Sequence, residues 1–359
     1  MNAVTETLAA DTANAAASAA SAAATSPRSA RRDWTPLNYD LRDTWFPVSH
    51  SRDVTEKPIR RIVHSQPYFL WRDHAGKPLA AEFRPEQLEQ RRAQASAFTG
   101  GSGFYPVVER YGYIWSWYGN PDNADEQLLP HIPFLPLDGS LPGYTQRTVR
   151  FDSTSALSIE NLIDLTHADF LHANTIGDGT SESDIVETEW TSETVTRTRI
   201  VTQKSVAPIM RWVGGVRAKY QDFRAVLHVH LRSNVCISYP RFRPGYDVPN
   251  LQPFVPVGRH RSRCDVTFNT TAAPIPLRYV MPRIAFVIQP QDNSVIRPQN
   301  ERYFDPDERL DLHSRFDAPG TRYRFLMDQL VQRQARGDFS YGSDAEPGRD
   351  IRALLGMVD

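Results

Sequence analysis

Two histidines and an aspartate lie close together in the segment 160–172, which reads ENLIDLTHADFLH. His167 and His172 are five residues apart, and Asp164 precedes His167 by three. On a helix, residues three apart share a face, so the sequence predicts that Asp164 and His167 project to the same side. An interval of five does not fit one helical face, so we expect the helix to loosen or end before His172. Both imidazoles can then turn toward a common point and bind a metal ion.

The chemistry of such a site depends on its ligand set. Two neutral imidazoles and one carboxylate on one side of a metal leave other coordination positions open, which iron(II) needs in order to bind and activate O2. The spacing H-x4-H alone is equally compatible with histidines that cap helices or form hydrogen bonds in a core. The third ligand has to come from a later part of the chain.

The residues around the histidines extend the pattern to E-N-L-x-D-x-T-H-x-x-F-x-H. This string resembles the iron-binding segment of the catalytic, alpha-type subunits of Rieske non-heme iron oxygenases, in particular the branch with vanillate and dicamba O-demethylases. The resemblance implies that His167 and His172 bind Fe(II) and that Asn161 and Asp164 serve catalysis. In intact members the subunits form rings, and the aspartate matching Asp164 bridges the cluster of one chain and the iron of its neighbour.

A second stretch, 286–299, reads FVIQPQDNSVIRPQ and resembles the family's helix that carries the third ligand. The resemblance places Asp292 on the ligand position. Pro290 lacks a backbone N–H, so the helix is either kinked there or restarts with Pro290 in its first turn. If it restarts, Asp292 serves as a helix cap and not as a ligand. Gln291 is a further departure, because family members commonly have Glu at this position.

The region before these segments shows a different departure from the family. A W-R-D-x-x-G turn and the run YPVVERYGYIWSWYG are similar to the framework of the N-terminal Rieske domain. Family members place C-x-H and C-x-x-H between these landmarks, since two thiolates and two imidazoles hold the 2Fe-2S cluster. This chain has AAEFRPEQLEQRRAQASAFTGGSG there, without cysteine or histidine. We therefore predict that the chain carries no 2Fe-2S cluster and that a polar helix over 84–97 replaces the cluster loops.

The pattern of the whole chain predicts an α+β fold. We expect four regions, namely a disordered Ala-rich tail (1–32), a small β-rich Rieske-like domain without cluster loops (33–119), a Pro-rich linker (120–144) and an iron-binding catalytic domain (145–359). In the last region, β-type runs predict an antiparallel sheet, and the resemblance implies that this sheet grips a long helix with the pocket between them. In the run LHVHLR, strand alternation puts His228 and His230 on one face. We expect both to line the pocket or face solvent, with a metal site as the alternative.

The amino-acid composition excludes some classes of binding partner. A formal net charge of −1 without a dense basic stripe excludes nucleic acid. No apolar run has the length of a membrane span. The alanine-rich start lacks the basic and leucine-rich parts of a secretory signal, although a cryptic targeting segment stays open. Cys236 and Cys264 are isolated, so we expect no disulfide and a cytoplasmic location.

These expectations combine into one function, with alternatives. The resemblance implies an oxygenase, either a monooxygenase or a dioxygenase, that uses O2 to hydroxylate or oxidatively demethylate a small apolar or aromatic molecule. Electrons would come from a separate Rieske or ferredoxin protein and its reductase, and the subunits would form a homo- or hetero-oligomer such as a trimer-like ring. Two alternatives stay open: a non-catalytic companion subunit, and an iron oxygenase that takes electrons from its substrate.

Overall fold

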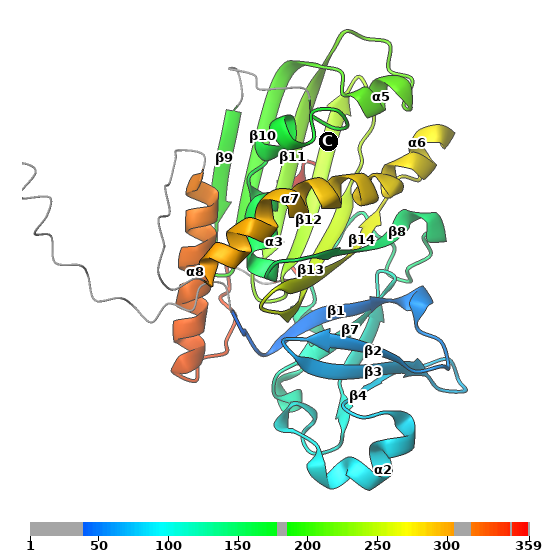
Figure 1. The fold of residues 1–359 in the computed structure, drawn as a ribbon, viewed down its shortest axis with the longest axis vertical. Coiled ribbons are helices and arrows are strands. Elements are labelled where there is room, and N and C mark those ends of the chain that lie inside the picture. Colours follow the sequence, from blue (N-terminus) through cyan, green and yellow to red (C-terminus); the bar gives the residue numbers. More distant parts are fainter. Residues whose placement is uncertain (1–38, 178–184, 305–316, 345–346, 358–359) are drawn as a thin grey trace, which may run out of the picture. The chain divides into compact units, whose positions relative to one another are not determined.

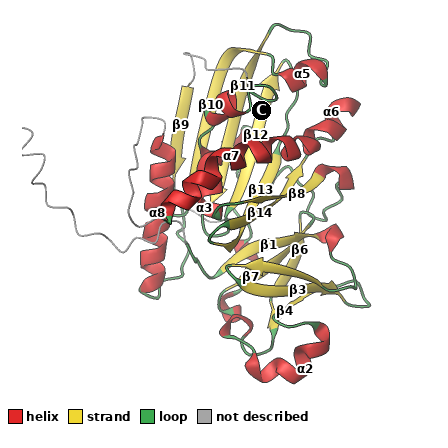
Figure 2. Ribbon diagram, viewed as in Figure 1, coloured by secondary structure: helices red, strands yellow, loops and turns green. Residues whose placement is uncertain are grey.

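The computed structural model describes residues 39–177, 185–304, 317–344 and 347–357. The expected disordered tail, 1–32, lies outside these residues. Within them, helices mix with sheets whose strand pairs are all antiparallel, which confirms the predicted α+β class (Figure 2). None of the helices in this part of the chain combines the length and the apolar composition that crossing a membrane requires.

Two small sheets come first in the described chain, in the orders β1-β7-β6 and β2-β3-β4-β5 (Figure 1). Their strands are β1 (Thr44–His50), β2 (Ile59–Val63), β3 (Gln66–Arg72), β4 (Pro78–Ala81), β5 (Phe104–Tyr105), β6 (Val107–Arg110) and β7 (Tyr113–Tyr118). All six residues of β7 are buried, because the strand is covered on both faces. Trp115 and Trp117 pack against the large sheet described next, and Ile114 and Tyr118 pack within the small sheets.

The large sheet has the strand order β8-β14-β13-β12-β11-β10-β9. Its strands are β8 (Gln146–Phe151), β9 (Ile185–Trp190), β10 (Thr194–Ser205), β11 (Tyr220–His230), β12 (Val235–Arg243), β13 (Asn250–Gly258) and β14 (Arg261–Phe268). Side chains alternate between two buried faces. On β12, Cys236 and Phe242 belong to the cluster under the helices, which we call the helix face. Ile237 and Tyr239 belong to the cluster with the tryptophans, which we call the back face.

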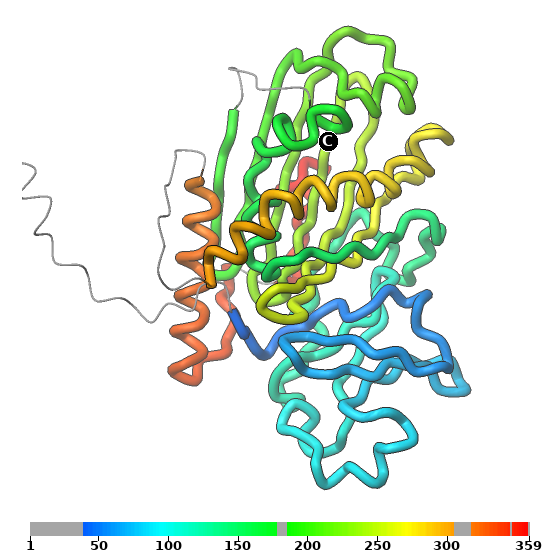
Figure 3. Tube along the Cα trace, in the orientation of Figure 1, coloured from blue at the N-terminus to red at the C-terminus, as the bar shows by residue number. Residues whose placement is uncertain are grey.

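The helices are α2 (Leu88–Arg91), α3 (Ser155–Ile163), α4 (His167–Leu171), α5 (Pro208–Trp212), α6 (Ile275–Val280), α7 (Ala285–Tyr303), α8 (Ala318–Ala335) and α9 (Arg352–Leu355). On the helix face, α3 contacts β13 and β14, and α7 contacts β8. Although more than 100 residues separate them in the chain, α3 and α7 lie side by side (Figure 3). This pairing brings the two predicted ligand segments together.

The predicted polar helix over 84–97 is shorter and less regular than expected, with helical turns over 85–94. The segment contains only the four-residue α2 between two 3-10 turns, η2 (Pro85–Gln87) and η3 (Arg92–Gln94). No residue in these three elements is buried. Without a packed face, a short helix is marginal in water, so helix propensity alone does not sustain it.

A buried carboxylate organises the same segment. Glu82 accepts hydrogen bonds from the backbone N–H of Ser96 at 2.9 Å and from the hydroxyl groups of Ser96 and Thr99. Gly103 closes the loop, since its carbonyl accepts from the Glu82 N–H at 3.1 Å. Residues 82–103 therefore form a compact connector that the Glu82 carboxylate and backbone hold together through hydrogen bonds.

The predicted linker, 120–144, is not detached from the fold. Leu129, Ile132 and Phe134 are buried in the cluster on the back face of the large sheet. The Asn269 side chain donates to the Phe134 carbonyl at 2.6 Å, which ties the segment to the chain after β14. The division into domains at this segment stays a prediction.

Candidate metal centre

The helix predicted around His167 is divided in two. α3 ends at Ile163, and Asp164 follows as its C-cap with φ −75° and ψ 83°. The Asp164 carboxylate accepts from the backbone N–H of Thr166 at 3.0 Å and from its hydroxyl, a local bond that competes with helix continuation. α4 then begins at His167, and it ends before His172 as expected. The prediction that Asp164 and His167 share one helical face is wrong, because the helix breaks between them.

The break gives His167 a fixed tautomer. Its Nδ1 is hydrogen-bonded to the backbone carbonyl of Asp164. A carbonyl oxygen only accepts, so Nδ1 carries the proton and Nε2 keeps its lone pair. It is thus the main chain of Asp164, and not its carboxylate, that orients His167.

His172 has the same tautomer through a different partner. Its Nδ1 lies 2.8 Å from Oε1 of Gln291, which accepts the ring proton. Its Nε2 is buried and faces Oδ1 of Asp292. The two imidazole rings are nearly perpendicular, at 81°, with centroids 5.1 Å apart.

Asp292 lies well inside α7, which begins at Ala285 and runs through Pro290 without a break. The alternative that Asp292 caps a helix start is therefore excluded. Asp292 is 7% exposed, and its Oδ1 lies 3.5 Å from Nε2 of His167 and 3.0 Å from Nε2 of His172. Asn161, on α3, donates its amide N–H to the same Oδ1 at 3.0 Å and so holds the carboxylate in place.

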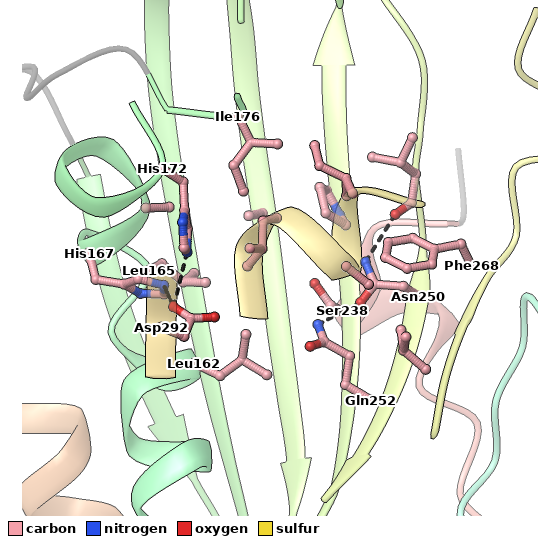
Figure 4. Close-up of a pocket in the computed structure, with 18 of the residues that line it drawn as sticks. Leu162, Leu165, His167, His172, Ile176, Ser238, Asn250, Gln252, Phe268 and Asp292 are labelled. Carbon is pink, nitrogen blue, oxygen red and sulfur yellow. Dashed lines mark hydrogen bonds and ion pairs between the residues drawn. The ribbon is translucent and has the colours of Figure 1, made fainter. Parts of the chain in front are cut away.

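Two nitrogen lone pairs and one carboxylate oxygen therefore converge. The candidate ligand atoms of His167, His172 and Asp292 lie within 4.8 Å of one another, and Figure 4 shows the three side chains pointing together. Lone pairs that face one another repel unless a cation joins them. The donor set, with an acceptor behind each imidazole, fits a divalent metal ion that accepts nitrogen and oxygen ligands.

Without a metal ion, a proton on His167 supplies the positive charge next to the Asp292 carboxylate. Burial raises the pKa of Asp292, but His167 and His172 outweigh burial and lower the pKa to about 2. Burial lowers the pKa of His167, but the adjacent Asp292 carboxylate outweighs it and raises the pKa above the usual 6.5. Metal binding and protonation of His167 therefore compete for the same place.

A cavity of about 180 Å³ opens beside the three residues, between α7 and the helix face of the sheet. Most of its lining is apolar. The apolar residues are Val149, Phe151, Leu162, Leu165, Ala168, Ile176, Phe223, Ala225, Pro240, Phe242, Val248, Cys264, Val266, Phe268, Met281, Ile284, Ala285 and Ile288. Such a space suits a small aromatic or aliphatic molecule with one end at the candidate metal ligands.

Two sets of polar residues in the cavity were missed by the sequence analysis. Asp169 on α4 binds both Arg199 and Lys204 of β10, and all three are buried. The second set is Ser238, Asn250 and Gln252, from β12 and β13. Asp169 lies inside the segment 160–172, but its partners Arg199 and Lys204 lie on β10, so no pattern within the segment identified them.

His228 and His230 do not line the cavity. The rings lie against each other on one face of β11, with centroids 4.7 Å apart, as strand alternation predicts. Each is only 5% exposed, and their neighbour Val226 belongs to the back-face cluster. The prediction that they line the pocket or face solvent is wrong. Burial lowers the pKa of His228 to about 4.

Several known proteins are similar to this chain. Residues 151–333 match the family described as the vanillate O-demethylase oxygenase C-terminal domain. The oxygenase subunit of vanillate O-demethylase from a Pseudomonas species is 33% identical over 199 residues, which are 47% of this chain and 56% of that protein. The oxygenase component of dicamba O-demethylase from Stenotrophomonas maltophilia is 25% identical over 165 residues, 37% of this chain and 48% of that protein.

The chain thus spans about half the length of these curated relatives. Among solved structures, dicamba monooxygenase bound to 3,6-dichlorosalicylic acid has a TM-score of 0.67 at 17% identity, covering 82% of this chain and 98% of that one. This likeness concerns the fold. Because the family match covers half of the sequence and includes both candidate ligand segments, the chain belongs to the vanillate O-demethylase oxygenase family, the branch of Rieske oxygenase alpha subunits that its motifs resemble.

Proposed function

We propose that this chain is the oxygenase component of a multicomponent enzyme and binds Fe(II) through His167, His172 and Asp292. The observation that carries the proposal is the convergence of two imidazoles, each with its Nδ1 proton engaged, and one carboxylate at an apolar cavity. Bound Fe(II) with three protein ligands supplies open coordination positions at which O2 is activated.

The protein's own residues hold this arrangement. The Asp164 carbonyl and the Gln291 amide fix the imidazole tautomers, and Asn161 fixes the carboxylate. The apolar cavity walls exclude water and orient the substrate. The chemistry is O2-dependent hydroxylation or oxidative demethylation of a small aromatic molecule, in keeping with relatives named for the demethylation of vanillate and dicamba.

The electrons come from a separate protein in this proposal. Residues 80–103 contain no cysteine or histidine, and Glu82 organises the loop through hydrogen bonds. Oxygen activation at Fe(II) held by these residues would need two electrons from outside, more than a single bound iron ion could supply by itself. A Rieske or ferredoxin partner with its reductase therefore acts in trans, with Asp164 as the electron port, on a homo- or hetero-oligomer of this chain.

The first test measures metal and acid-labile sulfide after anaerobic reconstitution with Fe(II). We expect about one iron per chain and no stoichiometric sulfide. His167→Ala should lose most of the iron, because two remaining ligands compete poorly with water, and His131→Ala, which alters a partly exposed histidine, should keep it. Stoichiometric sulfide in a folded preparation contradicts the cluster-less proposal. A folded chain that binds no iron points instead to a companion subunit.

The second test measures product formation in single and multiple turnovers, with and without candidate Rieske and reductase proteins. We expect multiple turnover only when a donor is present. Full turnover with O2 and substrate alone would refute the donor in trans and favour the substrate as the reductant.

A further inference from the structure

One part of the cavity wall is polar and uncharged. It consists of Ser238 on β12 and of Asn250 and Gln252 on β13, which we call the amide ledge. Ser238 is the register partner of Asn250, and Gln252 follows two residues later, so alternation turns all three toward the cavity. Figure 4 shows the amide ledge across the cavity from His167 and His172.

The hydrogen bonds within the amide ledge leave some polar groups free. Asn250 donates to the Val248 carbonyl at 3.2 Å and accepts from the Gln252 amide at 2.7 Å. In the described part of the chain, neither Gln252 Oε1 nor the Ser238 hydroxyl has a hydrogen-bond partner. The amide ledge therefore offers an acceptor and a hydroxyl that can donate or accept. In an apolar cavity, such groups favour a ligand atom that bonds to them.

The cations of the cavity are already engaged. Among the described lining residues, the Lys and Arg side chains are Arg199 and Lys204, and both bind the buried carboxylate of Asp169. Arg199 also donates to the Leu165 carbonyl at 2.9 Å, and Lys204 lies 5.4 Å from the ring centroid of Phe223. An acidic group at the amide ledge would lose its hydration without gaining a free cation. A neutral group loses far less.

We propose that the amide ledge selects substrates with a neutral hydrogen-bonding group, namely a hydroxyl or a carboxamide. This group lies on the end of the aromatic body opposite to the carbon that is oxidised. A hydroxyl or amide N–H donates to Gln252 Oε1, and the oxygen of the same group accepts from Ser238. The inference rests on the proposed function, since it takes the cavity to be the substrate site.

The experiment uses four para-substituted anisoles with one common ring and methoxy group. They are 4-methoxybenzyl alcohol, 4-methoxybenzamide, 4-methoxybenzoate and 4-methoxytoluene, and calorimetry measures their binding to the full chain loaded anaerobically with Fe(II). The alcohol and the amide should bind about tenfold more tightly than the toluene and the benzoate, the size expected for one or two net hydrogen bonds.

Two variants remove the amide ledge's free groups, Gln252→Met and Ser238→Ala. Each should reduce the preference for the alcohol and amide to within about threefold of the toluene, with unchanged toluene affinity showing that the cavity is intact. Gln289→Met is the matched control. Gln289 also lines the cavity, but its amide donates to the backbone carbonyl of Arg150, so the preference should persist.

The outcomes separate the two proposals. If the benzoate binds most tightly, or if Gln252→Met and Ser238→Ala both keep the full preference, the neutral-group inference is overturned while the aromatic site stands. If none of the four compounds binds to the metal-loaded chain, the aromatic substrate site itself fails.

Discussion

At the scale of single residues, the candidate metal site depends on the groups that are hydrogen-bonded to its candidate ligands. The imidazole of His167 is oriented by a main-chain carbonyl, which no substitution removes directly. The imidazole of His172 is oriented by the side chain of Gln291, the residue before Asp292. The Gln291 side chain thus orients one candidate ligand, His172, and precedes another, Asp292, along α7.

We therefore predict that Gln291→Leu weakens metal binding by about 10- to 100-fold, the range typical for loss of a hydrogen-bonded partner behind a histidine ligand. The buried Nδ1 proton would lose its acceptor. Gln291→Glu keeps an acceptor and should bind metal at least as tightly as the wild type. Competition with a chromophoric chelator, using Co(II) or Fe(II), measures both. Equal affinity in Gln291→Leu and wild type would remove Gln291 from the site.

A second residue prediction concerns Asp164. Asn retains a side-chain oxygen for the N–H of Thr166, and the backbone carbonyl that orients His167 is unchanged. Asp164→Asn should therefore keep near-normal iron content while losing most donor-dependent turnover, because it removes the charge that we assign to the electron port. Iron analysis and single-turnover product formation are the measurements. Unchanged donor-dependent rates would remove Asp164 from the electron path.

At the scale of elements, a buried ion cluster fastens α4 to β10. Asp169 is 2% exposed and binds Arg199 and Lys204, which are also buried. Because α4 begins at His167, this cluster also sets where that ligand lies relative to the sheet. Thus α4, which carries the candidate ligand His167, is positioned by an ion cluster whose members are not candidate ligands.

Asp169→Ala should lower the free energy of unfolding by about 3–5 kcal/mol, because it leaves two buried cations without their shared carboxylate. Urea unfolding measures the change. The control is Glu301→Ala, which breaks the exposed pair Arg297–Glu301 on α7 and should cost less than about 1 kcal/mol. A comparable small loss in both variants would show that other groups neutralise Arg199 and Lys204.

At the scale of the whole molecule, the large sheet has two buried faces with different roles. The helix face forms one wall of the cavity, and the helices packed on this face carry the candidate ligands. The back face packs against residues from the small sheets, as when Tyr113 donates to the Asp265 carbonyl at 2.7 Å. His228 and His230 belong to this back face, where water cannot solvate a charged imidazole.

Stability should therefore fall in mild acid. An unfolded His228 takes up a proton near pH 6.5, whereas the folded residue has its pKa lowered to about 4 by burial. Between these pH values the unfolded state binds more protons than the folded state. As the pH falls, this residue therefore lowers the free energy of unfolding by about 1.4 kcal/mol per pH unit. His230, whose pKa is also lowered, acts in the same direction. His167 acts oppositely, since its raised pKa stabilises the metal-free fold below pH 6.5 and loses that effect as pH rises through the folded value.

The measurement is urea unfolding of the metal-free protein between pH 7 and 4.5, in wild type and His228→Asn. Asn removes the titration and retains a polar atom near Thr196, the hydrogen-bond partner of His228 at 2.7 Å. As the pH falls, the free energy of unfolding of the variant should decrease less than that of the wild type, by about 1.4 kcal/mol per pH unit. Parallel curves would show that His228 does not titrate on unfolding.

The sequence by itself determined the fold class, the antiparallel sheet and the three residues that the structure brings together. Strand periodicity is a local property, and the family strings around His167 and Asp292 are contiguous, so neither required knowledge of distant contacts. β13 has no clear strand pattern, because Pro253 and Pro256 lie inside it and proline argues against a strand that donates to its neighbours. Asn250 and Gln252 lie on β13, so no local signal placed them in the cavity.

Only the tertiary structure decided the rest. It kept α7 continuous through Pro290, buried His228 on the back face and surrounded Asp169 with two cations. Each of these outcomes depends on groups far apart in the chain, as Asp292 does on His172, 120 residues before it. Burial and charge pairing act through space, and their energies exceed the local propensities from which a sequence pattern is read.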